Sequence, residues 1–278
     1  MKKLKTLMLA LCAAATGCLC AATSEISVSL KLTAHDYVIG ERVRGVIDIK
    51  NISPDSISVG YPDSRDYLLI EVYKAADMEE LEKTSKRAFS APFRLDPNEG
   101  QKLEVHIADH FGVSIPRRYL ARPVLVHRST RYEGQYVAFD IVPGMETTSA
   151  LQTFSNRDGL MRDFKLVHWT RNGDEHIFLT AQDQGTSERS WETRDLGPMM
   201  RITKPFISIL PSGKVIVFHR LGPDNFLRSE FWSMPDALEF VSRELVQDPE
   251  TAGQTRVKEL YDSAGGVKPV DRPWWKFW

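Results

Sequence analysis

The amino-acid sequence predicts a mainly β fold, built from antiparallel sheets and ending in one or two helices. Apolar and polar residues alternate with a period of two along much of the 278-residue chain, as in strands with one buried face. Two tight turns, at Asn172-Gly173 and at Pro211-Ser212-Gly213, each separate a pair of such runs. All three cysteines lie within the first 22 residues, so apolar packing alone must hold the later strands together.

Residues 1–22 have the composition of a secretory signal peptide. Three lysines and no acid accompany an apolar stretch from Leu7 to Ala15, which is too short to span a bilayer. Small residues follow at Cys20-Ala21-Ala22, so we expect cleavage after Ala22. The sequence therefore predicts a bacterial protein that is exported to the periplasm or out of the cell.

A lipoprotein signal is the second interpretation of the same segment. Ala15-Thr16-Gly17 places small residues directly before Cys18, where lipidation would occur. The motif departs from the common pattern, which has leucine at the position of Ala15. Membrane attachment would then depend on the lipid at Cys18 alone, and the fold would not change.

Composition disfavours several classes of function. The chain has a net charge of −1, and removal of residues 1–22 with their three lysines leaves −4. This balance disfavours nucleic-acid binding, which depends on clustered lysine and arginine. After cleavage behind Ala22, no cysteine remains for a disulfide, a thiolate metal site or a nucleophile.

In the first half, short alternating runs predict a series of antiparallel strands. Ile26, Val28 and Leu30, for example, share one face of the first run. Residues 76–86 instead predict a surface helix, because acids and lysines recur there at the i,i+4 spacing. The expected strands are 25–32, 42–50, 57–59, 67–73, 103–107 and 136–142. Of these, 67–73 is a dense apolar and aromatic run, which favours a central strand.

Turns in this half resemble those of bacterial immunoglobulin-like sandwich domains. Residues 37–43 carry a Gly-Glu turn that leads into a strand, and this strand ends in Asn51-Ile52-Ser53. Residues 93–100 carry an L-x-P-x-x-G turn before a later strand. The resemblance covers about 25–142 and implies an antiparallel sandwich over residues 23–144. It transfers no functional residue, because this fold serves many unrelated functions.

Residues 145–266 are predicted to form a second region built on a sheet. A linker is expected at the boundary, over Pro143-Gly144 and 145–149. The two hairpins cover 164–180 and 206–220, and a further strand over 226–232 is expected to extend the sheet. The second hairpin has apolar side chains on both faces, so we expect both of its faces to be covered.

Helices are expected at the end of this region. A capping-box pattern begins at Ser233, and an apolar stripe with helical spacing follows it up to Leu245. Residues 255–264 predict a second, weaker helix. Residues 267–278 then remain as an extended aromatic tail.

Trp169, Arg171, Asp174 and His176 are the main internal candidates for a binding surface. The two-residue turn between them pairs Arg171 with Asp174 and Trp169 with His176, so all four share one face of the sheet. They form either an ordinary cross-strand cluster or a patch whose aromatic and arginine side chains anchor a partner.

No catalytic, metal or cofactor site is predicted. His168 faces away from His176 in this register, so these two histidines cannot share a metal. His106 and His110 have the spacing of helical zinc ligands, but the alternation around His106 predicts solvent-facing residues of a strand. The sequence contains neither a G-x-S-x-G elbow nor a glycine-rich phosphate loop.

Trp274, Trp275 and Trp278 make the tail the most unusual segment of the chain. Burial stabilises such a side chain by about 1.5–3 kcal/mol, so exposure would be costly. We expect the tail to dock into a groove of its own chain. A partner protein and a membrane interface are the alternative sites.

These observations favour a non-catalytic binding or adaptor module of the cell envelope, with a protein or an envelope polymer as its partner. A secreted protease inhibitor is an alternative, because inhibitor-like sandwiches share the same turns. A hydrolase of envelope polymers is a third interpretation. It would require His168, His176, His219 or Arg220 to converge with a carboxylate in one cleft.

Overall fold

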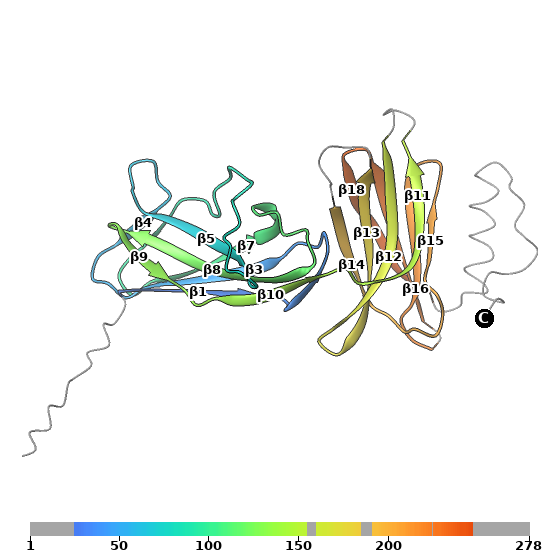
Figure 1. Ribbon diagram of the computed structural model, residues 1–278, viewed down its shortest axis with the longest axis horizontal. Helices are drawn as coiled ribbons and strands as arrows, with labels where there is room; N and C mark the ends of the chain where they lie inside the picture. The colour runs from blue at the N-terminus through green and yellow to red at the C-terminus, as the bar shows by residue number, and fades with distance from the viewer. Residues whose placement is uncertain (1–24, 155–159, 185–190, 224, 247–278) are drawn as a thin grey trace, which may run out of the picture.

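The structure is a computed structural model that describes residues 25–154, 160–184, 191–223 and 225–246 (Figure 1). These residues confirm the mainly β prediction: they form antiparallel sheets, with one short 3-10 turn and no helix of seven or more residues. Within the same ranges, no helix is long and apolar enough to cross a membrane. The strands form an N-terminal half (Ile26–Val142) and a C-terminal half (Met145–Val246).

Two facing sheets and one small strand pair make up the N-terminal half. Its strands are β1 (Ile26–Leu32), β2 (Asp36–Val38), β3 (Arg44–Asn51), β4 (Ile57–Val59), β5 (Tyr67–Lys74), β6 (Phe93–Leu95), β7 (Gly100–His106), β8 (Arg117–His127), β9 (Thr130–Glu133) and β10 (Val137–Val142). One sheet has the order β1-β3-β7, and the other has the order β2-β10-β8-β5 with β9 beside β8. Strand β2 pairs with β10 in parallel, whereas the other pairings are antiparallel.

The inward faces of these strands form one apolar core, and all six strands expected in this half are confirmed. Ile47 of β3 and Val72 of β5 are completely buried within it. The ring of Phe139 lies between two tyrosine rings, 5.5 Å from Tyr119 and 6.2 Å from Tyr37 between centroids. The sequence pattern therefore predicted most of this core but missed the part that β8 contributes. It was also wrong to favour a central position for 67–73, because β5 lies at the edge of its sheet.

Asn51 connects two turns of the N-terminal half. Its buried amide Nδ2 donates to the carbonyl oxygens of Asp55 at 2.8 Å, Leu95 at 3.3 Å and Asp96 at 3.2 Å. Its Oδ1 accepts hydrogen bonds from the backbone N–H and the hydroxyl of Ser53. A buried amide needs partners of this kind, which explains why Asn and Ser stand at the end of β3.

Residues 76–86 do not form the predicted helix. The backbone N–H of Leu81 donates to the Val72 carbonyl at 2.8 Å, and Glu80 forms an isolated β-bridge with Tyr73. The Leu81 side chain also packs against the core. The prediction was wrong because unpaired backbone groups at the edge of β5, together with apolar burial, outweigh weak helical ion pairs.

Strand β8 is central to its sheet but was not predicted. Three arginines interrupt its alternation, and Pro123 argues against a central strand because it has no N–H. Pro123 is tolerated where the neighbouring strand changes from β9 to β10. Its carbonyl still accepts a hydrogen bond from the N–H of Gly134 at 2.8 Å.

The C-terminal half consists of two further antiparallel sheets that share a core. Its strands are β11 (Met145–Thr153), β12 (Met161–Arg171), β13 (Asp174–Gln184), β14 (Trp191–Pro198), β15 (Phe206–Ile209), β16 (Lys214–Arg220), β17 (Phe226–Met234) and β18 (Ala237–Val246). The sheet orders are β11-β12-β13-β14 and β15-β16-β17-β18, so each strand lies beside its neighbour in sequence. Residues 145–149 belong to β11, which restricts the linker to Pro143-Gly144.

Both predicted hairpins are confirmed, as is the strand after them. Asn172 and Gly173 have φ values of 53° and 91°, and the register pairs Arg171 with Asp174 and Trp169 with His176. In the second hairpin, Phe206 pairs with Phe218. Strand β17 extends that sheet as expected.

The helix predicted from Ser233 is wrong, because Ser233 lies in β17 and a hairpin leads directly into β18. Arg162, on the facing sheet, explains this outcome. Its buried guanidinium pairs with Asp183 and donates to the Ser233 hydroxyl and to the carbonyls of Met234, Pro235 and Ala237. These carbonyls are satisfied by a distant arginine rather than by helical N–H groups. Residues 255–264 lie outside the described ranges.

Candidate binding site

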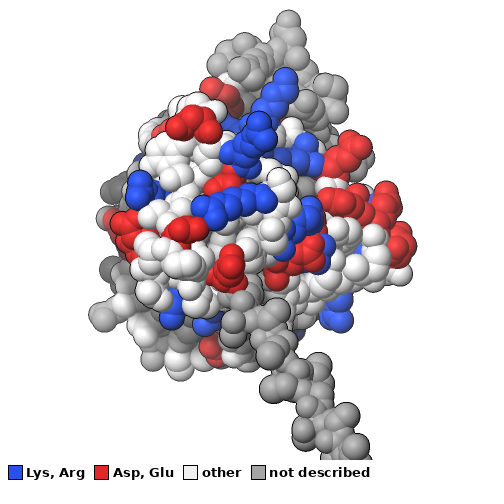
Figure 2. Space-filling view, turned by 90° about the vertical axis from the view of Figure 1, so that its left-hand side faces the viewer, with Lys and Arg blue, Asp and Glu red and all other residues white. Residues whose placement is uncertain are grey.

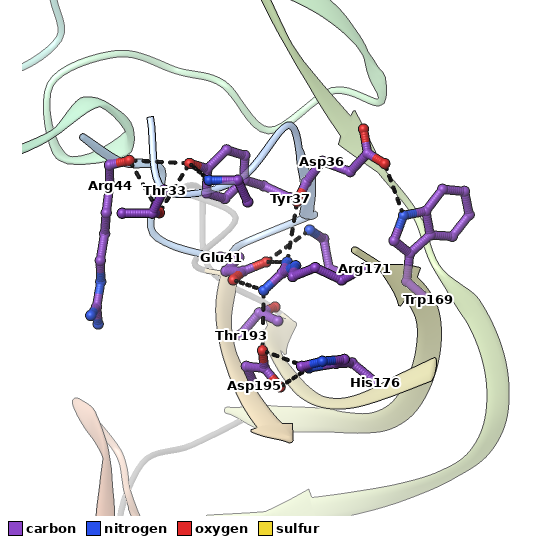
Figure 3. Close-up of polar contacts among 12 residues, drawn as sticks. Thr33, Asp36, Tyr37, Glu41, Arg44, Trp169, Arg171, His176, Thr193 and Asp195 are labelled. Carbon is purple, nitrogen blue, oxygen red and sulfur yellow. Dashed lines mark hydrogen bonds and ion pairs between the residues drawn. The ribbon is translucent and has the colours of Figure 1, made fainter. Parts of the chain in front are cut away.

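The two halves meet where the segment 36–41 lies against the ends of β12, β13 and β14 (Figure 3). Gly40, at φ 80°, turns the chain so that its carbonyl accepts a hydrogen bond from the N–H of Thr193 at 3.0 Å. The Thr193 hydroxyl donates to the Ile39 carbonyl at 2.6 Å. Backbone and side chain thus hold the two halves together at β14.

Apolar side chains also pack in this joint, which is the contact between residues 36–41 and the ends of β12, β13 and β14. Val38 from the N-terminal half packs with Val167 and Phe178 from the C-terminal half, and all three are buried. Ile39 and Trp169 cover the same cluster from its edges. Hydrophobic burial therefore adds to the hydrogen bonds between the halves.

Arg171 is the centre of the polar part of the joint (Figure 3). Its guanidinium forms two hydrogen bonds with the Glu41 carboxylate, at 3.0 and 2.6 Å, and one with Asp195 at 3.1 Å. It also donates to the Asp36 carbonyl and lies 4.9 Å from the Phe178 ring centroid. Burial alone would lower the pKa of Arg171, but the Glu41 carboxylate outweighs it and the pKa is raised.

Three of the four residues predicted as an internal binding surface contribute to this joint. Besides Arg171, Trp169 donates from Nε1 to Asp36 at 3.4 Å, and His176 Nδ1 lies 3.1 Å from both carboxylate oxygens of Asp195. Asp174 is exposed at the tip of the hairpin. Their shared face is therefore largely occupied by the N-terminal half, which the sequence could not reveal.

A cleft of about 600 Å³ opens beside the joint. Its N-terminal wall is the segment from Thr33 to Arg44, and its C-terminal wall is the open edge between β14 and β18. Its lining includes the side chains of Arg42, Arg44, Arg194, Phe240 and Arg243. The cleft thus combines aromatic surface with guanidinium groups from both halves.

Positive charge dominates the lining, which contains five arginines and two acids. The acids are Glu41 and Asp195, and Arg171 binds both of them. Arg194 pairs with Glu192, which lies outside the lining. Most of the negative charge near the cleft is therefore already neutralised.

Three further arginines of the lining have no carboxylate partner within the described ranges. Arg42 and Arg44 are exposed, and neither forms an ion pair with a described residue. Arg243 donates only to the Asp195 backbone carbonyl, at 3.3 Å, and lies 5.9 Å from the Phe240 ring centroid. Such guanidinium groups can accept carboxylate or phosphate oxygens in bidentate geometry.

The opposite end of the N-terminal half has a different surface. Figure 2 shows lysine and arginine interleaved with aspartate and glutamate on that end. Arg128 pairs there with Asp55, and Arg131 pairs with Glu71 and Glu133. The arginines named at that end therefore have carboxylate partners, unlike Arg42, Arg44 and Arg243 of the cleft.

Among the residues that the structure describes, the cleft lining does not pair a hydroxyl group with a histidine. It contains no histidine, and its two threonine hydroxyls, Thr33 and Thr193, are hydrogen-bonded to groups of the protein itself. His219 lies buried behind the lining, where burial and then Arg243 lower its pKa to about 4. Arg220 donates to the Gly222 carbonyl. Of the residues considered for a hydrolase, His176 contacts a carboxylate of the lining, Asp195, but His168, His176, His219 and Arg220 are not themselves in the lining of this cleft.

The remaining histidines form protein contacts. His110 is not a solvent-facing strand residue as predicted, because it follows η1 (Ile107–Asp109) and is buried with its ring 4.4 Å from that of Phe89. His35, Asp36 and Asp140 are close enough to share a cation. However, Arg118 binds both carboxylate oxygens of Asp140, at 2.9 and 2.8 Å. We therefore interpret this cluster as an ion-pair network.

The arginines of the cleft were missed at the level of sequence. Arg42 and Arg44 are two residues apart at the start of a strand, which would have placed them on one face. No local pattern, however, brings Arg194 and Arg243 to the same place. The possible lipidation site Cys18 and the tail residues Trp274, Trp275 and Trp278 lie outside the described ranges.

Comparison with known proteins adds no functional information. No protein-family model matches the chain, and no curated protein matches its sequence.

Proposed function

We propose that this protein is an exported, non-catalytic binding module of the bacterial cell envelope that holds an anionic envelope polymer in its cleft. One observation carries the proposal: Arg42, Arg44 and Arg243 face one cleft from two halves of the chain without a carboxylate partner. Unpaired guanidinium groups at such a place favour carboxylate or phosphate ligands.

The joint supports this proposal because it positions both walls before a ligand arrives. Glu41, at the joint, directly precedes Arg42, and Thr193 and Asp195 flank Arg194. The contacts that hold the halves together therefore also set the separation of the arginines. A preorganised site loses less entropy when it binds, which favours affinity.

An exposed aromatic side chain supports a polymer with apolar surface between its charges. Phe240 is more than half exposed in the cleft lining, so its ring can contact a ligand. An acidic polysaccharide offers ring faces for aromatic contact and carboxylates for the arginines. The half-open cleft also leaves room for a chain to extend beyond it.

We also propose that the N-terminal half is an immunoglobulin-like sandwich. The two facing sheets, β1-β3-β7 and β2-β10-β8-β5, support this assignment, as does the short strand β2 that runs parallel to β10. Export is supported by the signal-peptide composition of residues 1–22. Folds of this kind present binding surfaces in many exported proteins.

Titration with polygalacturonate tests the proposed function. We expect the protein to bind this anionic polymer but not neutral dextran, and we expect R42A/R44A to bind at least about tenfold more weakly. The control K50A/K102A removes the same charge from exposed positions of β3 and β7, and should bind like the natural chain. Equal weakening of both variants would indicate general charge attraction and would contradict a specific cleft. Potent inhibition of a secreted protease would favour the inhibitor alternative instead.

A further inference from the structure

The sheet β15–β18 has an outward face with an apolar centre. Val215, Val217 and Phe231 point into the core, so the residues that alternate with them point outward. The apolar members of this outward face are Phe206, Ile216, Phe218, Phe226 and Trp232. The second hairpin therefore has the two apolar faces that its sequence predicts.

This face is more buried than an outer sheet surface should be. Ile216 has no exposed surface, yet it belongs to no core cluster of the described residues. Its cross-strand neighbour Glu230 is only 6% exposed. The N-terminal half does not cover this face, because its joint lies on β12–β14 of the other sheet. Glutamate is seldom buried so deeply unless it is paired, and Glu230 has two cationic partners on this face.

We propose that the outward face of β15–β17 is the docking site of the chain's own aromatic tail, Trp274–Trp278. Strand β18 ends at Val246, and 27 residues separate Val246 from Trp274 in the sequence. An extended chain covers about 3.3 Å per residue, whereas neighbouring strands are about 4.8 Å apart. The tail can therefore reach every strand of this face.

The chemistry of the face selects an apolar occupant. Lys214 and Arg228 both pair with Glu230, so the charges at the centre largely neutralise one another. The Lys214 ammonium lies 5.5 Å from the Trp232 ring centroid, and the Arg228 guanidinium lies 5.9 Å from that of Phe218. Tryptophan side chains offer large apolar surfaces and further faces for such cations. A charged polymer, by contrast, would find few unpaired charges here.

A peptide-binding experiment tests this proposal independently of the cleft. A synthetic peptide of residues 267–278 is titrated into the full chain and into a chain that ends at Gly266. We expect the peptide to bind the shortened chain. Its affinity for the full chain should be at least about tenfold lower, because the chain's own tail competes with it. F218S in the shortened chain should lower the affinity for the peptide by a similar factor. The control L151S changes a residue of β11 that is 58% exposed on the other sheet, and should have no effect. Circular dichroism confirms that each variant retains its β structure.

Several results would overturn the proposal. Equal binding of the peptide to both chains would show that the tail does not occupy the face, and no binding to the shortened chain would show that the face does not accept it. Equal effects of F218S and L151S would remove the assignment to this sheet. If the full chain dimerises but the shortened chain does not, the tail binds a second copy. If only the full chain binds anionic phospholipid vesicles, the tail binds a membrane.

Discussion

The joint and the cleft lie side by side, and both contain arginine. The arginine of the joint is paired with carboxylates, whereas several arginines of the cleft have no acidic partner among the described residues. Arg171 is largely enclosed in the joint, with its side chain 13% exposed, and is bound by two carboxylates and a backbone carbonyl. Arg42 and Arg44 are exposed in the cleft and have no acidic partner among the described residues. Burial of a charge is costly without partners, so Arg171 needs its network for stability. The exposed arginines carry no such requirement and remain available to a ligand.

R171A tests the structural side of this comparison and should have the largest effect. Removal of the guanidinium leaves Glu41 and Asp195 close together at the joint, so we expect a loss of about 3–5 kcal/mol in the free energy of unfolding. Urea denaturation measures this loss. R44A is the matched control and should change stability by less than about 0.5 kcal/mol. Similar effects of both variants would abolish the distinction between the two regions.

His219 adds a pH dependence from the region behind the cleft. Burial, assisted by Arg243, lowers its pKa from 6.5 to about 4. The unfolded chain therefore takes up a proton below pH 6.5, whereas the folded protein does so only near pH 4. Stability from this group is complete above pH 6.5 and is lost as the pH falls towards 4, by about 3 kcal/mol in total.

Urea denaturation at several pH values between neutrality and pH 4 measures this dependence. H219Q should flatten the decline, because glutamine does not titrate. H35Q, at an exposed histidine, serves as the control and should retain the decline of the natural chain. A decline that persists unchanged in H219Q would assign the acid sensitivity to other groups.

R243A tests the C-terminal wall of the cleft. Arg243 has only a backbone carbonyl as its hydrogen-bond acceptor, so its guanidinium remains available to a ligand. Its removal should lower the affinity for polygalacturonate by about tenfold, or about 1.4 kcal/mol. The effect on unfolding should remain within about 0.5 kcal/mol. Calorimetric titration measures the affinity. Unchanged affinity would restrict the site to the N-terminal wall.

N172A should have the smallest effect and tests how the hairpin supports Arg171. Asn172 has a φ of 53°, a conformation that costs alanine about 1 kcal/mol more than asparagine. We therefore expect a loss of about 1 kcal/mol in the free energy of unfolding, without a change in polymer affinity. T170A, in the same hairpin but outside the left-handed turn, is the control. A loss as large as that of R171A would indicate that the turn and the joint unfold together.

Local patterns predicted the strands but not the connections that depend on distant partners. Alternation identified the strand around Ile47, a dense apolar run identified the strand around Val72, and Asn172-Gly173 identified a hairpin and its complete register. The predicted helices failed because backbone groups were satisfied from elsewhere in the fold, by the edge of β5 and by Arg162. Helical spacing is weak information when a sheet edge or a buried arginine competes with it.

The site was less predictable than the fold. The sequence correctly grouped Trp169, Arg171 and His176 on one face, but it could not show that Glu41 and Asp36 would occupy that face. The contacts that join these residues span more than 100 positions of the chain. The open arginines of the cleft likewise become visible only when both halves are in place.

The salt dependence of polygalacturonate binding tests the central claim most directly. Each arginine that binds an anionic group should contribute to the decrease of affinity with ionic strength, through screening and release of counterions. We predict that R42A/R44A has both a lower affinity and a clearly shallower salt dependence than the natural chain, whereas K50A/K102A matches the natural chain. Parallel salt dependences in all three proteins would contradict the account, because the open arginines would then not be the groups that bind the polymer.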